Sequence, residues 1–159
     1  MVKSLKKYYW QISITVFMVF FLAGCGADNG NESNNALLNA TNPKPLNIAA
    51  KGKDNAETIK KDVSSMSQIY DVAVIEGKKD TLVAYKVKHM HRFRMKAIEK
   101  ELNKRLEKKY PKENFTVSSD YKVFLEAVRL KERIDKKGLP KDKAEKELQK
   151  IIKLQTEMT

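Results

Sequence analysis

The spacing of hydrophobic residues changes several times along this chain, and each change marks an expected element. Behind a polar start at Asp54, apolar residues recur every three or four positions up to Met66, which predicts a helix over residues 54–68. Two short runs rich in β-branched residues follow, 69–76 and 81–88, with a Gly-containing turn between them. This pattern predicts a β-hairpin.

The second strand of this hairpin alternates apolar and basic residues. Val83, Tyr85 and Val87 share one face, whereas Lys86 and Lys88 point the other way. Such alternation is typical of an antiparallel sheet with one face on the core and one in solvent. We therefore expect the face that carries the lysines to be solvated.

A second helix and a third strand complete the predicted sheet. Apolar residues from Met95 to Tyr110 recur at helical spacing, Pro111 ends that helix, and residues 115–118 form a short strand. A helix between two strands requires a crossover, so the third strand should run parallel to the second. Residues 54–119 thus predict an α+β domain in the order αββαβ, with its helices on one face of a three-stranded mixed sheet.

Residues 120–159 predict a C-terminal helical hairpin. Asp120 is placed to cap one helix, Gly138 to end it, and Pro140 to begin a last amphipathic helix. The preceding domain, of about 66 residues, is close to the lower limit for a self-sufficient core. We expect the hairpin to add apolar cover to it.

The N-terminus reads as an export signal. Residues 10–24 are almost entirely apolar and follow three lysines, but the run is shorter than the roughly 20 residues that a permanent membrane span needs. It ends in a motif that resembles the bacterial lipobox, Leu22-Ala23-Gly24-Cys25. The resemblance implies cleavage after residue 24 and a diacylglyceryl thioether on the cysteine, and two acyl chains suffice for stable membrane attachment. The alternative is an ordinary signal beside a small buried cysteine.

Between this signal, residues 1–24, and the predicted domain lies a polar segment. Residues 26–50 contain seven Asn with two Pro and little that could form a core. We therefore interpret residues 25–53 as the lipidated cysteine followed by an Asn-rich, disordered tether.

Charge adds a candidate contact surface. The chain has 32 Lys and Arg against 20 Asp and Glu, a formal net charge of +12, which favours anionic partners. Export argues against nucleic acid and leaves anionic lipid or a wall polymer. The densest basic run outside the signal is the candidate contact surface, and it consists of Lys86, Lys88, Arg92, Arg94 and Lys96. The alternative is that this run is a solvated face whose aromatic residues, Tyr85 and Phe93, belong to the core.

The sequence offers little for catalysis or metal binding. His89 and His91 are the only histidines, two ligands are too few for a site, and the neighbouring cations repel a metal ion. The chain has no Gly-rich phosphate loop, no G-x-S-x-G elbow and no H-E-x-x-H motif. We expect neither a metal nor a cofactor, and no enzyme. The alternative is an envelope enzyme or accessory subunit acting on wall polymer, which would need two carboxylates fixed across a cleft.

The combined features resemble one family. A lipobox, an Asn-rich segment, the stretch Asn55 to Ile75 with its N-x-A-x-x-I-x-x-x-V-x-x-M pattern, the hairpin, and the sequence F-T-V-S-S-D at residues 115–120 are similar to the YhcN/YlaJ sporulation lipoproteins. The resemblance covers roughly residues 54–130 plus the signal. It implies a lipoprotein on the extracytoplasmic face of a forespore or spore membrane, with a role in spore formation or germination, a spore-envelope protein as a further partner, and no enzymatic reaction.

Overall fold

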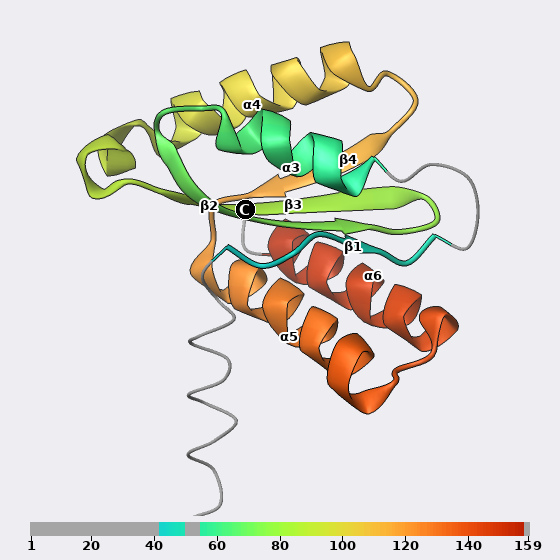
Figure 1. The fold of residues 1–159 in the computed structure, drawn as a ribbon. Helices are drawn as coiled ribbons and strands as arrows, with labels where there is room; N and C mark the ends of the chain where they lie inside the picture. Colours follow the sequence, from blue (N-terminus) through green and yellow to red (C-terminus); the bar gives the residue numbers. More distant parts are fainter. Residues whose placement is uncertain (1–41, 50–54, 158–159) are drawn as a thin grey trace, which may run out of the picture. The chain divides into compact units, whose positions relative to one another are not determined.

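The computed structural model describes residues 42–49 and 55–157, and these form an α+β domain with a four-stranded sheet and four α-helices (Figure 1). Helices lie both above and below the sheet in Figure 1. The predicted α+β class is therefore confirmed. The predicted signal peptide, Cys25 and most of the predicted tether lie outside the described residues.

The sheet is mixed and follows the chain in the order β1-β2-β3-β4. The hairpin of β2 (Ile69–Glu76) and β3 (Asp80–Val87) is antiparallel, and β4 (Asn114–Ser118) runs parallel to β3, both as predicted. The prediction of three strands was wrong, because β1 (Leu46–Asn47) pairs in parallel with the end of β2. This two-residue strand lies within the segment interpreted as tether, where one leucine beside prolines gives no strand periodicity.

Helices α3 (Ala56–Ser64) and α4 (Met95–Lys109) cover one face of the sheet (Figure 1). Helix α3 lies within the predicted range 54–68 but is shorter, and the side chain of its N-cap, Asn55, makes no capping hydrogen bond. The core of this face is made by residues from both helices and from alternate strand positions: Ala56, Ile59, Val63, Met66, Ile69, Val72, Val74, Val83, Tyr85, Val87, Ile98, Leu102, Leu106 and Val117.

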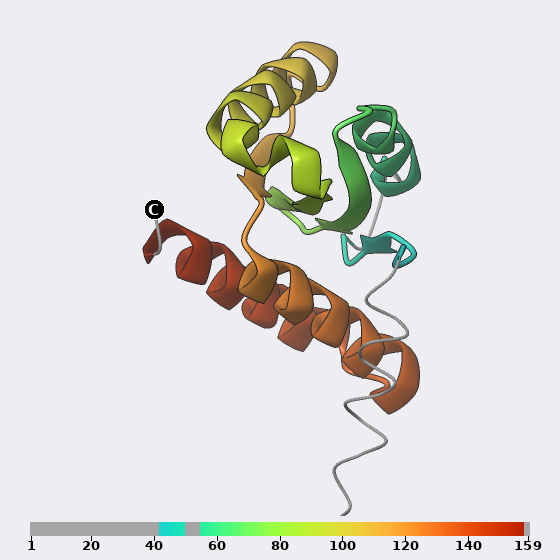
Figure 2. The ribbon, with the colours of Figure 1, turned by 90° about the vertical axis from the view of Figure 1, so that its left-hand side faces the viewer.

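Helices α5 (Tyr121–Lys137) and α6 (Lys141–Glu157) form the predicted hairpin and cover the opposite face (Figure 2). Asp120 caps α5 by accepting the backbone N–H groups of Lys122 and Val123, and Gly138 ends it with a left-handed φ of 61°. The second core comprises Ile48, Ala73, Ile75, Leu82, Ala84, Val123, Phe124, Ala127, Val128, Leu130, Ala144, Leu148 and Ile151. The two helices of residues 54–119 thus lie on one face of the sheet, as predicted, and the expected apolar cover from the hairpin is confirmed on the opposite face.

Both faces of the β2–β3 hairpin are consequently buried, and the expected solvated face does not exist. The side chain of Lys86 is 16% exposed, and its Nζ lies 4.0 Å from the ring centre of Phe124 and 3.4 Å from Oδ2 of Asp71. Asp71, with a side chain only 2% exposed, also accepts the backbone N–H of Asn42 at 2.9 Å. Lys86 thus links β3 to β2 and α5, and Asp71 links β2 to Asn42, the first described residue, at the same end of the sheet.

We predict that Lys86→Met destabilises the domain by about 3 kcal/mol, because it leaves the Asp71 carboxylate buried without its cation. Lys88→Met, two residues further on at an exposed position, should change the free energy of unfolding by less than about 0.5 kcal/mol. Urea unfolding of both variants measures the difference. Equal stability of the two variants would contradict the structural role given to Lys86.

Candidate functional site

A short 3₁₀ helix, η2 (His89–Arg94), connects β3 to α4 and lies at the end of the sheet opposite the β2–β3 turn. None of its six residues is buried. In Figure 1 the connection extends beyond the strands and helices on the left of the view. This segment therefore contributes little to the core, and its side chains are available to solvent.

The segment carries positive charge without any compensating acid. No Asp or Glu occurs between Asp80 and Glu99. The four remaining members of the predicted run, Lys88, Arg92, Arg94 and Lys96, are all exposed. Across residues 42–49 and 55–157 their side chains form no ion pair. We call residues 88–96 the basic loop.

The start of α4 adds to the positive potential of the basic loop. Its first turn contains no acid and its N-cap, Arg94, makes no capping hydrogen bond. The other three helices each place an acid at or near the N-terminus, namely Glu57, Asp120 and Asp142. Because the helix dipole is positive at this end, basic residues here are unfavourable for stability and favourable for an anion.

The alternative reading, in which the aromatic residues of this run belong to the core, holds for one residue and fails for the other. Tyr85 is completely buried, but Phe93 is 99% exposed. Met90 on the same segment is 87% exposed. The structure separates the predicted run into Lys86, which is held in a buried ion pair, and the exposed basic loop.

The chain enters the domain at the same end of the sheet. Asn42 bonds to Asp71, which pairs in register with Lys86 just before the basic loop begins. The candidate lipid site, Cys25, and its lipobox residues Leu22, Ala23 and Gly24 precede this point and lie outside the described residues.

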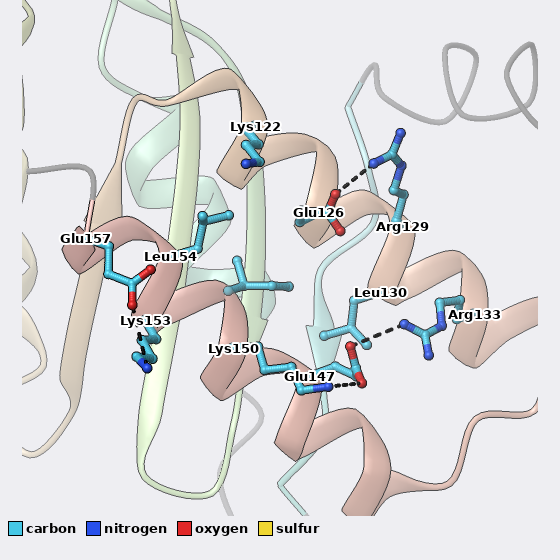
Figure 3. Close-up of a pocket in the computed structure, with 11 residues that line it drawn as sticks. Lys122, Glu126, Arg129, Leu130, Arg133, Glu147, Lys150, Lys153, Leu154 and Glu157 are labelled. Atoms are coloured by element: carbon cyan, nitrogen blue, oxygen red, sulfur yellow. Dashed lines mark hydrogen bonds and ion pairs between the residues drawn. The ribbon is translucent and has the colours of Figure 1, made fainter.

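A second candidate is an open groove of about 420 Å³ between α5 and α6 (Figure 3). Its lining includes three apolar residues, Leu130, Ile151 and Leu154. Most charged residues around it pair within the groove: Arg129 with Glu126 at 2.7 Å, and Arg133 and Lys150 with Glu147 at 3.3 and 3.0 Å. The groove therefore lacks the uncompensated charge of the basic loop.

Groups with shifted pKa values lie in structural contacts. Burial disfavours ionised Asp62, but hydrogen bonds from Lys109 and Tyr110 outweigh it and hold the pKa of that carboxyl below its ordinary value. Burial and the bond to Asp62 raise the pKa of Tyr110. Burial, with a contribution from Glu99, raises the pKa of Tyr85 to about 12. These contacts join α3 to α4 and fill the core, so the shifts have structural causes.

The described part of the chain contains no cluster of three or more potential metal-ligating His, Cys, Asp or Glu residues. Among the helices of residues 55–157, none has the length and apolar character required to cross a bilayer. Comparisons with models of protein families, with curated proteins and with solved structures found no significant match.

Proposed function

We propose that this chain is a non-enzymatic lipoprotein of sporulating bacteria, anchored through Cys25 to the extracytoplasmic face of a forespore or spore membrane. Its domain contacts the anionic surface of that membrane through the basic loop, and it acts in spore formation or germination. The observation that best supports the membrane contact is the basic loop, whose four exposed cations have no acidic partner in the described chain. The signal, the lipobox and the resemblance to YhcN/YlaJ lipoproteins support the anchor and the setting.

The entry point of the chain makes the anchor and the contact compatible. Asn42 follows Cys25 by 17 positions along the chain, and at ~3.4 Å per position this length spans at most ~58 Å. Because Asn42 lies at the same end of the sheet as the basic loop, a membrane-attached N-terminus can present the loop to its own bilayer without crossing the domain.

The expected binding energy of the basic loop indicates that it acts together with the lipid anchor on Cys25. Each Lys or Arg near an anionic membrane contributes about 1 kcal/mol, so the four cations supply about 4 kcal/mol. Alone, this corresponds to a dissociation constant of about 1 mM. A lipid anchor on a short connection provides an effective concentration of about that size. The domain should therefore exchange between docked and undocked states, and salt or lipid charge would shift the balance.

The anchor is tested by Cys25→Ala. Without the thiol no thioether can form, so we expect unprocessed precursor and no incorporation of labelled palmitate, whereas the wild-type chain is processed and labelled. Growth in labelled palmitate followed by electrophoresis reads both properties. Palmitate label that persists in the Cys25→Ala chain would contradict the assignment.

The contact is tested by replacing Lys88, Arg92, Arg94 and Lys96 with Gln in unlipidated residues 26–159. Lys86 is left unchanged because its ion pair supports the fold. Binding to anionic vesicles at low salt should weaken roughly 100- to 1,000-fold, as expected for the loss of about 1 kcal/mol per cation. Wild-type binding should also fall as salt rises, since exposed charges are screened beyond about 8 Å at physiological ionic strength.

A matched control removes the same charge from the opposite end of the sheet. The exposed residues Lys79, Lys141, Lys143 and Lys146 lie on the β2–β3 turn and the first turns of α6, which Lys78 and Asp142 join at 2.8 Å. Their replacement by Gln should leave most of the vesicle binding intact. If both quadruple variants lose equal affinity in co-sedimentation, net charge rather than the basic loop is responsible for binding.

A further inference from the structure

Two large apolar side chains project from the basic loop into solvent. Phe93 is 99% exposed and Met90 is 87% exposed, and they are the two most exposed large hydrophobic residues in the described chain. Both belong to η2, in which no residue is buried. Neither side chain therefore contributes to the core of the domain.

The residues around Met90 and Phe93 indicate what kind of partner covers these two side chains. A large apolar side chain in water is unfavourable and promotes association, so an exposed Phe and Met within one short segment call for a partner. The segment is also free of acids, and its four cations form no ion pair within the described chain. Apolar residues beside Lys and Arg are the combination that lies at the boundary between phospholipid headgroups and acyl chains.

The location of the basic loop in the domain favours a lipid bilayer over an acidic protein as its partner. The chain enters the domain through Asn42, at the end of the sheet where the basic loop lies. On the proposed anchor at Cys25, this end is the one tethered closest to the bilayer. The anionic headgroups complement the loop charge, and the acyl layer beneath them accepts Phe93 and Met90, which headgroups or a polyanion alone would leave in water.

We propose that Met90 and Phe93 insert into the lipid at the headgroup–acyl boundary while Lys88, Arg92, Arg94 and Lys96 bind the lipid phosphates. This inference rests on the proposed membrane contact and deepens it. Docking then depends on access to the acyl layer as well as on charge. The domain would distinguish an anionic bilayer from an anionic wall polymer, which offers phosphates without an acyl layer.

A tryptophan introduced at position 93 tests the insertion in the mature lipoprotein, residues 25–159. Trp10, the only tryptophan of the chain, lies in the signal that the proposed processing removes, so Phe93→Trp alone gives the mature lipoprotein a single reporter at an exposed site that tolerates the larger ring. The purified protein is reconstituted into anionic or neutral vesicles. Separate samples contain lipid brominated in the acyl chain or lipid with a quencher on the headgroup. Lys143→Trp, at the far end of the domain, is the control.

For the Phe93→Trp reporter, insertion predicts a shift of the indole emission to shorter wavelength in anionic vesicles, with quenching by the brominated acyl chains. The Lys143→Trp control should show neither effect. Quenching from the headgroup alone would overturn insertion while leaving the proposed surface contact in place. Absence of both kinds of quenching at position 93 in anionic vesicles would overturn insertion and contact together. Equal acyl-chain quenching at positions 93 and 143 would also overturn the proposal, because it would show no preference for the basic loop.

Discussion

The burial of both faces of the β2–β3 hairpin is the constraint on which the rest of this structure depends. Strand β3 directs Val83 and Tyr85 to one side and Leu82 and Ala84 to the other, and all four are completely buried. A sheet that is apolar on both faces must be covered on both. Helices α3 and α4 satisfy one face, and α5 and α6 are required for the other. The C-terminal hairpin is therefore part of the domain and not an appendage.

This constraint also decides which charges are free to act. Lys86 lies on the face covered by α5, so it is held by Asp71 and by the ring of Phe124. After β3 ends at Val87, the chain continues into η2, in which no residue is buried. The cations that follow Val87 in this segment are consequently exposed, whereas Lys86, which precedes it, is largely covered. The candidate contact surface begins where the two-sided core ends.

Local signals in the sequence were sufficient to predict much of the fold. The hairpin follows from β-branched runs around a Gly turn, and the ends of α5 follow from Asp120 and Gly138, because capping and left-handed turns are decided by a few adjacent residues. Strand β1 could not be predicted, since two residues give no period and its pairing with Ile75 is a long-range choice. The burial of Lys86 was missed for a related reason. Alternation within β3 shows which residues share a face, but only the docking of α5 determines that the lysine face is covered. The exposure of Phe93 was equally hidden, because an aromatic residue near a helix start is as compatible with core as with solvent.

The central claim is that the domain meets an anionic bilayer through one end of the sheet and through residues 88–96 alone. Amide hydrogen exchange of the reconstituted mature lipoprotein, compared between anionic and neutral vesicles, tests it without altering any side chain. The account predicts slower exchange in anionic vesicles confined to the basic loop, which includes the first two residues of α4, with α5 and α6 unchanged. Unchanged exchange in the basic loop, or protection along the groove between α5 and α6 instead, would contradict it.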